Sequence, residues 1–110
     1  MNMTAQGYSA RNGFALNQIY NIHCLDGLKQ LDSNSIDMVL TSPPYDNLRN
    51  YKTNISNIWG DFIWKPVLKE LFRVIKQGSV VVWVVGDATI DGSETGTSFQ
   101  QALYAKEIGF

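Results

Sequence analysis

The hydrophobic pattern of the chain alternates between short apolar runs and stretches with helical spacing. Residues 17–23 carry apolar side chains at 19, 20 and 22 and predict a short strand, and residues 36–41 form a second, strongly apolar one. Leucines at helical spacing predict a short helix over 25–31 between them. The nearly unbroken valine run at 79–85 is typical of a strand that is buried on both faces.

Two longer amphipathic stretches predict further helices. The first begins at Asp61 and ends at 76–78, where a basic residue and a glycine are common stop signals. Because proline disrupts a helix interior, this helix either begins nearer Pro66 or bends there. The second begins at 97–100, which matches a capping box, and runs to about Lys106.

The order of elements predicts an α/β fold. Strands that alternate with helices favour a mostly parallel sheet with right-handed crossovers. We expect residues 1–16 to form a flexible arm and 17–110 to form the domain, with a polar loop at 86–96. Ligands of such sheets bind beyond the carboxyl ends of strands, so 42–45 and 86–87 are the candidate site.

Composition narrows the possible functions. The net charge of −1 lacks the basic excess of a free-standing nucleic-acid binder, so any attraction to DNA must come largely from elsewhere. With one cysteine and one histidine, the chain has no zinc-binding spacing and no internal disulfide. The apolar runs are far shorter than the roughly 20 residues of a membrane helix, and no signal peptide is evident. We therefore expect a cytoplasmic protein without a membrane partner.

Residues 42–45, Ser-Pro-Pro-Tyr, suit chemistry on an amino group. The exocyclic amino nitrogen of a nucleobase is a poor nucleophile because its lone pair is delocalised into the ring. A Ser hydroxyl and a Pro carbonyl that accept its two hydrogens would favour the tetrahedral, reactive geometry. Two consecutive prolines stiffen this backbone, and Tyr45 offers a face on which an extruded base can stack.

The segment from Thr41 to Tyr45 resembles the catalytic motif of S-adenosylmethionine-dependent DNA amino-methyltransferases. Residues 19–28, 71–79 and 82–87 resemble further motifs of that family and follow in the family's order. The resemblance implies a partial Rossmann-like fold with helices on both faces of the sheet. It also implies S-adenosylmethionine as methyl donor, no metal, and double-stranded DNA as partner, in a prokaryotic or phage setting.

The resemblance also assigns roles to individual residues. The catalytic group is Ser42, Pro43, Pro44 and Tyr45, and the cofactor-binding group is His23, Cys24, Thr41 and Ser42. Contacts with DNA fall to Asp46, Arg49, Tyr51, Lys52 and Asp87. Asp87 can equally cap a turn, and the basic loop residues can simply be solvated.

Two departures from the family pattern bear on activity. Many relatives carry Gly-Asp where this chain has Ile22-His23, and the glycine-rich cofactor turn, Phe-x-Gly-x-Gly, does not precede Ser42. In the circularly permuted, beta-type members that turn lies further towards the C-terminus. The chain therefore resembles the N-terminal, catalytic-motif part of such an enzyme. We expect it to be inactive without the missing C-terminal half or a second subunit.

Several alternatives remain at this level. Serine in the first motif position favours cytosine N4 over adenine N6 as the methylated atom. RNA and protein-glutamine methyltransferases use a similar Pro-Pro-Tyr motif, and a truncated remnant or a non-catalytic partner subunit is a further possibility. Cys24 lacks the preceding proline that is typical of a cytosine-C5 nucleophile, and we expect it to be a small buried residue at a helix start.

Overall fold

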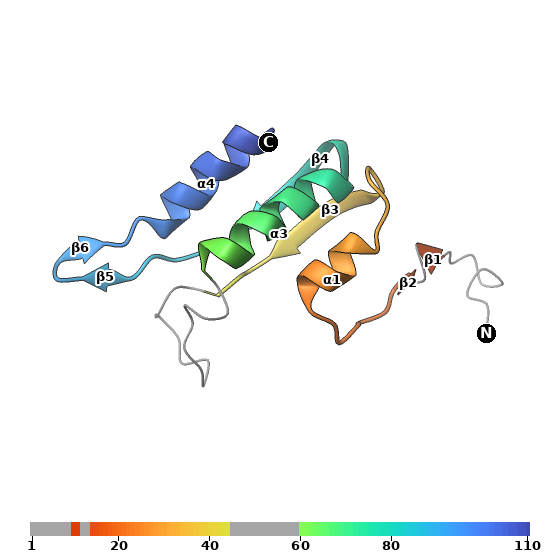
Figure 1. The fold of residues 1–110 in the computed structure, drawn as a ribbon, viewed down its shortest axis with the longest axis horizontal. Helices are drawn as coiled ribbons and strands as arrows, with labels where there is room; N and C mark the ends of the chain where they lie inside the picture. Colours follow the sequence, from red (N-terminus) through yellow and green to blue (C-terminus); the bar gives the residue numbers. More distant parts are fainter. Residues whose placement is uncertain (1–9, 12–13, 45–59) are drawn as a thin grey trace.

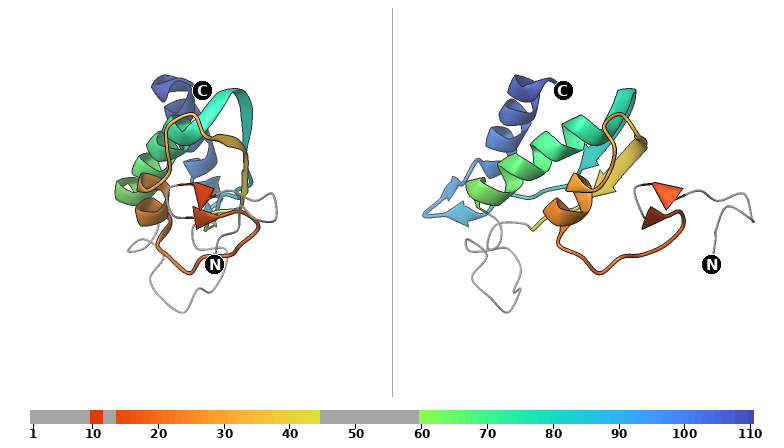
Figure 2. Two further views of the ribbon diagram at one scale, coloured as in Figure 1. Left: turned by 90° about the vertical axis from the view of Figure 1, so that its right-hand side faces the viewer. Right: turned by 45° about the vertical axis from the view of Figure 1, so that its right-hand side comes forward.

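The structure is a computed structural model that describes residues 10–11, 14–44 and 60–110, with only the backbone of residues 10, 11 and 61. A two-stranded parallel sheet forms its centre, and the helices lie together against one face of that sheet (Figures 1 and 2). Two small antiparallel pairs of strands accompany it, one near the N-terminus and one just before the last helix. The main elements in chain order are α1 (Cys24–Lys29), β3 (Ile36–Thr41), α3 (Asp61–Val74), β4 (Ile75–Trp83) and α4 (Thr97–Ile108).

The predicted α/β class is confirmed at the level of mixed helices and strands around a small parallel sheet. Met38 to Thr41 of β3 pair in register with Val80 to Trp83 of β4. The register shifts below this point, because Ile36 pairs with Ile75. One residue of β3 and four of β4, residues 76–79, lie between that pair and the pair of Met38 with Val80. Gly78, with φ of 79°, supplies the left-handed backbone conformation within that irregular stretch.

Helix α3 supplies most of the core. Its buried residues Trp64, Val67, Leu68, Leu71 and Val74 recur at helical spacing, so one face of the helix is apolar throughout. The helix begins at the first predicted residue and contains the proline, so the alternative of a later start is wrong. Pro66 is the sixth residue of the helix, so the bond that an N–H there would make to the carbonyl of Phe62 is given up in the second turn.

The predicted end of α3 at 76–78 is wrong, because the helix ends at Val74. Ile75 takes extended backbone angles, φ −74° and ψ 141°, and directly begins β4. Val74 and Ile75 are both buried, at 0% and 6% exposure. Burial of these two side chains where the helix meets the strand accounts for an end that precedes the stop signal. The positive φ expected of a stop glycine is present at Gly78 but belongs to the strand.

The prediction that the valine run is buried on both faces is also wrong. Met38 and Leu40 of β3 are 56% and 70% exposed, and Val80 and Val84 are 57% and 45% exposed. The three helices of the described residues, α1, α3 and α4, lie on the other side of the sheet from these exposed side chains (Figure 2). The helices on both faces that the family resemblance implied are therefore not seen in the described part of the chain.

The strand predicted at 17–23 is absent, since these residues form a turn and irregular backbone. Asn17 has φ of 58°, which breaks an extended course. The hydroxyl of Tyr20 accepts from the backbone N–H of Ala15 at 2.6 Å and donates to the carbonyl of Ala15 at 3.2 Å. Apolar side chains alone do not make a strand here, because Ile19 is fully exposed and no described strand pairs with this segment.

The predicted N-terminal arm, residues 1–16, lies partly outside the described residues. Within it, β1 (Ala10–Arg11) and β2 (Phe14–Ala15) form a short antiparallel pair. The ring of Phe14 meets that of Tyr20 edge-on, with ring centroids 4.7 Å apart. This contact joins the end of the arm to the segment that precedes α1.

The predicted loop at 86–96 contains a hairpin that the sequence analysis missed. Strands β5 (Thr89–Ile90) and β6 (Ser93–Glu94) pair across Asp91 and Gly92, which both have positive φ, 51° and 77°. Two positive φ values define the turn type that Asp-Gly favours, so the signal was present in the sequence. No helix of the described residues combines the length and apolar character that a membrane span requires.

Arg73 joins α1 to α3. Its guanidinium group donates to the carbonyls of Leu28 and Leu31, both at 2.9 Å, and to the hydroxyl of Ser33 at 3.2 Å. The same guanidinium group forms an ion pair with the carboxylate of Glu70, with 2.7 Å between Nη2 and Oε2. The last carbonyls of a helix lack intrahelical partners, so Arg73 completes the C-terminal end of α1. This arginine of the family-like stretch thus has a structural role.

Candidate functional site

The candidate site lies at the carboxyl end of the parallel sheet. The carbonyl of Thr41 accepts from the backbone N–H of Val84 at 2.9 Å, so β3 and β4 remain joined up to the residue before Ser42. Because the strands are parallel, Ser42 and Gly86-Asp87 leave the sheet at the same edge. The structure therefore brings the two predicted segments to one side of the fold.

The turn after β3 is anchored in the protein and not simply exposed. Pro43 is buried and Pro44 is half-buried, whereas Ser42 is exposed. Proline fixes its own φ and restricts the residue before it, so this short segment has little conformational freedom. A buried proline beside an exposed serine presents the hydroxyl from a stiff support.

Asp87 has a defined partner at the same edge. Its carboxylate accepts from the backbone N–H of Ser98 at 2.7 Å and from the Ser98 hydroxyl at 2.8 Å. These bonds cap the N-terminal end of α4 and place a negative charge where the helix dipole favours one. Two roles were predicted for Asp87, a cap and a DNA contact, and these hydrogen bonds support the cap.

The capping box predicted at 97–100 is wrong. The residue that precedes α4 is Gly96, with φ of 72°, and it makes no side-chain capping bond. Thr97 is already the first helical residue, so its hydroxyl lies one position too late to cap; it donates to the Thr95 hydroxyl at 3.4 Å instead. The cap comes from Asp87, on the far side of the hairpin.

The predicted cofactor residues His23 and Cys24 lie at the start of α1. His23 precedes the helix, and its Nδ1 accepts from the backbone N–H of Leu25 at 3.3 Å. The expected position of Cys24 at a helix start is confirmed, but its expected burial is wrong because the residue is exposed. His23 thus acts as a helix cap, which gives it a structural role.

A shallow hollow beside Cys24 allows a test of whether the described residues fit S-adenosylmethionine. It encloses about 410 Å³. The described residues that line it are uncharged, namely Phe14, Tyr20, Ile22, Cys24, Gly27, Leu28 and Leu31. The cofactor carries a ribose diol and a charged amino acid group, which need polar partners when bound. The residues that line this hollow therefore do not, by themselves, supply the polar partners that the whole cofactor needs.

Five of the predicted site residues lie outside the described residues. They are the aromatic base-stacking candidate and the four loop candidates for DNA contacts, namely Tyr45, Asp46, Arg49, Tyr51 and Lys52. Their roles stay predictions.

One buried polar contact behind the site was missed. The indole Nε1–H of Trp83, the last residue of β4, donates to Oε1 of Gln101 at 2.9 Å. Gln101 lies on α4 and is only 3% exposed. A buried hydrogen bond of this kind fixes α4 against the carboxyl end of β4. The sequence carries no signal for it, because an isolated glutamine on a helix is usually solvated.

The stiff Ser-Pro-Pro turn lies at the carboxyl edge of a parallel sheet. Comparison with known proteins gives methyltransferases as relatives. The chain is 57% identical over 76 residues to the orphan methyltransferase M.BamHII of Bacillus amyloliquefaciens, across 69% of this chain and 26% of that protein. It is 33% identical over 72 residues to the type II methyltransferase M.BglII of Bacillus subtilis, across 64% of this chain and 20% of that protein.

A third relative is the type II beta methyltransferase M.BslI of a Bacillus species, strain NEB-606, at 36% identity over 62 residues. That match covers 54% of this chain and 7% of the relative. No family model and no solved structure matches the chain significantly. The family resemblance drawn from the motifs is thus confirmed: over the matched stretch, the chain is a relative of type II DNA methyltransferases. The chain spans about a quarter of M.BamHII, and less of the other two.

Proposed function

We propose that the chain carries the amino-group-binding segment of an S-adenosylmethionine-dependent DNA methyltransferase of the restriction-modification type. The favoured target is the N4 nitrogen of a flipped cytosine, ahead of adenine N6. The observation that supports this most strongly is the turn at Ser42 to Pro44, which leaves the carboxyl end of a parallel strand with Pro43 buried and Ser42 exposed. The similarity to three methyltransferases supports the same assignment.

The proposed role of the turn follows from the chemistry of amines. The Ser42 hydroxyl and a proline carbonyl accept the two amino hydrogens of the base, so the nitrogen lone pair moves out of conjugation and points away from the ring. Acceptors that are already in place cost no reorganisation when the reaction occurs. Ser42 is thereby a catalytic residue that touches the reacting nitrogen, and the buried Pro43 holds it in position.

S-adenosylmethionine would supply an activated methyl group, but the hollow beside Cys24 does not fit all of it. We propose that the remaining contacts come from outside these residues, either from a longer chain or from a partner subunit. The small share of each relative that the chain spans is consistent with this. On this proposal the chain alone binds the cofactor weakly or not at all and has no turnover.

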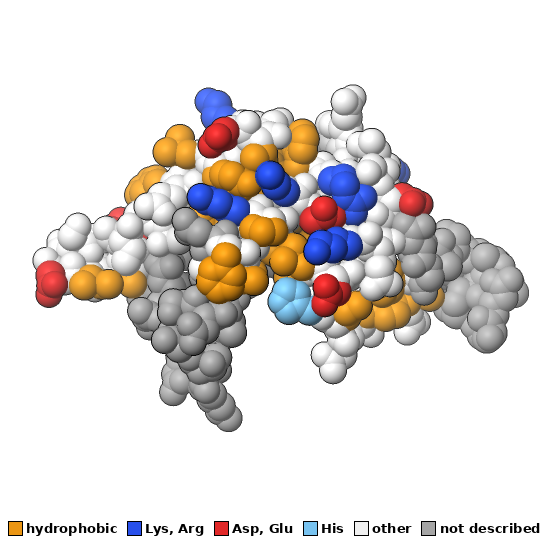
Figure 3. Space-filling model, viewed as in Figure 1, with side chains coloured by type: hydrophobic (Ala, Val, Ile, Leu, Met, Phe, Trp, Pro, Cys, Tyr) orange, Lys and Arg blue, Asp and Glu red, His pale blue; other side chains and the backbone are white. Residues whose placement is uncertain are grey.

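Attraction to DNA phosphates would also come from elsewhere. Basic side chains gather over α3 and α1 on the helix face, but acidic ones are interspersed with them (Figure 3). Arg73 of this face is bonded to Glu70, and the net charge of the chain is −1. A mixed surface of this kind provides little of the counterion release on which non-specific DNA affinity depends. The chain is therefore proposed to act on the base and not to hold the duplex.

The test uses a complete enzyme in which this chain replaces the matching stretch of M.BamHII. Ser42→Ala should remove most methyl transfer from labelled S-adenosylmethionine while cofactor affinity, measured by calorimetry, changes little. Ser93→Ala is the matched control, because Ser93 is an exposed serine of β6 and lies outside the Ser-Pro-Pro turn. Equal turnover by Ser42→Ala and Ser93→Ala would remove Ser42 from catalysis.

The chain alone tests the cofactor part of the proposal. Titration with S-adenosylmethionine by calorimetry should show weak or no heat of binding. Tight binding would contradict the proposal that essential cofactor contacts lie outside the described residues. Transfer to RNA or to a protein glutamine, in place of DNA, would favour the alternative substrates, and a chimera without any transfer would favour a non-catalytic segment.

A further inference from the structure

We propose that the β5–β6 hairpin, residues 89–94, lies in the major groove of the duplex beside the methylated base, where the carboxylate of Glu94 accepts a hydrogen bond from the amino group of a cytosine. This inference rests on the proposed function, because it takes duplex DNA as the substrate. It adds a sequence-reading element to the turn at 42–44, which holds the base that is methylated. Four features of the hairpin support it, namely its position, its anchorage, its exposure and its chemistry.

The hairpin lies at the edge of the sheet from which the proposed base-binding turn also leaves. Only residues 84–88 separate the end of β4 from the start of β5. Since β3 and β4 are parallel, the segments that follow them start from the same edge. The hairpin projects beyond this edge in both Figure 1 and Figure 2. A duplex that delivers a base to Ser42 would therefore pass close to the hairpin.

The base of the hairpin is anchored in the fold. Just below β5 and β6, the N–H of Thr95 donates to the carbonyl of Ala88 at 2.8 Å, and Ala88 is only 6% exposed. The carboxylate of Asp87, one residue earlier, accepts hydrogen bonds from Ser98 at the start of α4. These contacts hold the two strands at the point where they leave the domain. A hairpin with fixed ends presents its side chains in a defined direction, which a sequence-reading element needs.

The part of the hairpin beyond this base is open to solvent. Residues 89–94 are all exposed, in contrast to the buried Ala88 that precedes them. Within the described part of the chain, none of the polar side chains at 89–94 has a hydrogen-bond or ion-pair partner. Their donors and acceptors are thus available to another molecule.

The side chains of the hairpin suit the edges of bases and not phosphates. Residues 89–94 include two acidic residues, Asp91 and Glu94, and no lysine or arginine, so phosphate groups repel this element. The major groove admits a two-stranded β-ribbon, and there a carboxylate accepts from the amino group of cytosine, while a hydroxyl can bond to either kind of group. This chemistry indicates sequence reading in place of general attraction to DNA.

The strand register selects Glu94 as the reading residue. Thr89 pairs directly with Glu94, so their side chains share one face of the hairpin, and Ile90 and Ser93 share the other. A carboxylate beside a hydroxyl matches the cytosine amino group and the guanine acceptors of one G·C pair. The second face has a hydroxyl and an apolar side chain but no carboxylate, and Asp91 lies in the turn between the strands.

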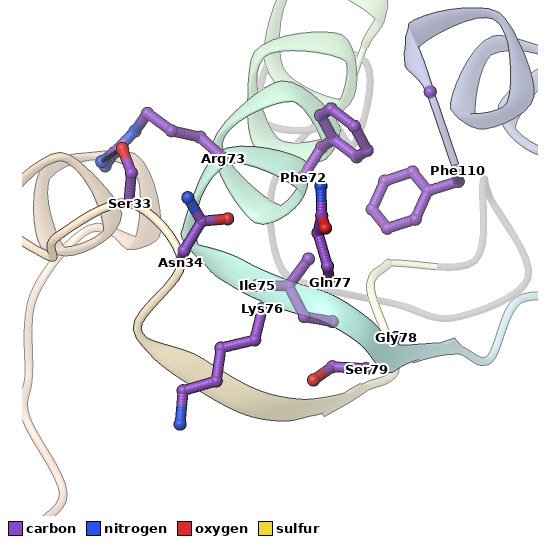
Figure 4. A pocket seen from close by; sticks show the side chains of 11 residues that line it. Ser33, Asn34, Phe72, Arg73, Ile75, Lys76, Gln77, Gly78, Ser79 and Phe110 are labelled. Atoms are coloured by element: carbon purple, nitrogen blue, oxygen red, sulfur yellow. Dashed lines mark hydrogen bonds between the residues drawn. The ribbon is translucent and has the colours of Figure 1, made fainter.

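The opposite end of β4 offers DNA no comparable surface. A hollow of about 660 Å³ lies there, with Arg73, Lys76 and Ser79 in its wall (Figure 4). Its two basic side chains are already engaged, because Arg73 donates to carbonyls of α1 and Lys76 pairs with Asp37. The carboxyl end of the sheet is therefore the side that we expect the duplex to meet.

The first test uses the chimera that carries this chain in M.BamHII and requires no catalysis. A photo-reactive benzophenone amino acid replaces Thr89, and the protein is irradiated with duplex DNA that bears the M.BamHII site. We expect cross-linking to a base near the methylated one, at several times the yield obtained with the same amino acid in place of Leu103. Leu103 lies on α4 and is 69% exposed, so it controls for exposure alone. Equal yields at the two positions, or cross-linking from position 89 to protein alone, would overturn the proposal.

A second measurement identifies the reading residue. The chimera methylates a library of duplexes with randomised base pairs around the methylated base, and the methylated molecules are captured and sequenced. Glu94→Gln should lower the preference for cytosine over adenine at one position roughly tenfold, because glutamine pairs with adenine and the carboxylate is lost. Ser93→Ala, on the other face of the hairpin, and Glu107→Gln, an exposed acid of α4, should leave the preference unchanged. No change with Glu94→Gln, or an equal change with Glu107→Gln, would remove Glu94 from sequence reading.

The two measurements separate this inference from the proposed function. If the chimera methylates DNA but the hairpin neither cross-links to bases nor affects the preference, the hairpin proposal alone is wrong. If the chimera transfers no methyl group to DNA, the proposed function fails, and the cross-linking result still decides whether the hairpin meets the duplex.

Discussion

Replacement of Arg73 by methionine should destabilise the fold far more than loss of an ordinary surface charge. The guanidinium group serves the carbonyls of Leu28 and Leu31 and the carboxylate of Glu70 together. Hydrogen bonds from a charged donor contribute about 1.5–3 kcal/mol each. The Arg73 side chain is 33% exposed, so water can replace part of each bond. We therefore expect a loss of about 2–3 kcal/mol in the free energy of unfolding.

Lys76→Met is the matched control for this prediction. Lys76 and Asp37 form an ion pair at 2.5 Å, but their side chains are 44% and 75% exposed. Pairs of this kind contribute about 0–1 kcal/mol, because solvent screens them and ordering two long side chains costs entropy. Arg73→Lys should be intermediate, since one ammonium group cannot reproduce the planar fork.

The assay is urea unfolding followed by circular dichroism, with the slope of the transition compared among the variants. A common slope shows that the variants differ in stability and not in compactness. Amide exchange in α1 should also accelerate in Arg73→Met, because the end of that helix loses its partner. If Arg73→Met and Lys76→Met differ by less than about 0.5 kcal/mol, the proposed role of Arg73 in joining α1 to α3 is wrong.

Other variants test the cap of α4 and two glycines. Asp87→Ala should cost about 1–2 kcal/mol in urea unfolding by removing the cap of α4, with Asp87→Asn retaining part of that stability; a neutral Asp87→Ala would contradict the capping role. Gly109→Ala should destabilise more than Gly78→Ala in the same assay. An added Cβ at Gly109 would lie 2.5 Å from Cζ of Phe72. An added Cβ at Gly78 would have no described atom within 4 Å, apart from those of Gly78 and its two chain neighbours. Gly78→Ala should cost only about 1–2 kcal/mol for its left-handed backbone, and equal losses would refute the clash.

Local sequence signals predicted the elements that their own residue types favour. The bounds of β3 agree with the apolar run, and α1 occupies the predicted region of leucine spacing. The Ser-Pro-Pro turn was placed at the end of a strand because proline cannot donate to a ladder. For these features the residue types alone carry the physical cause.

The features that sequence analysis missed depend on contacts between distant segments. The cap of α4 is the carboxylate of Asp87, which precedes the β5–β6 hairpin. The residues around Gly96 carry no sign of it, because Asp87 lies nine residues earlier in the chain. The end of α3 is set by burial of Val74 and Ile75 at the start of β4. Arg73 looks like any basic residue near a helix end until the carbonyls of α1 are placed beside it.

The valine run shows a different limit. Its composition indicates a strand suited to burial on both faces, yet Val80 and Val84 are exposed within the described chain. A hydrophobic pattern reports which surfaces favour burial, and it does not say which polypeptide covers them. In the same way, the family motif identified the class of protein, and we propose that the remaining cofactor contacts lie outside the described residues.

The most direct test of the proposed function is the identity of the methylated atom. Unmethylated DNA is incubated with the chimera that carries this chain in M.BamHII and with labelled S-adenosylmethionine, and the DNA is then digested to nucleosides and separated. We predict label in N4-methylcytosine with Ser42 intact, and loss of most of that label with Ser42→Ala. Label in 5-methylcytosine, or undiminished N4-methylcytosine with Ser42→Ala, would contradict the assignment of this turn to amino-group methylation.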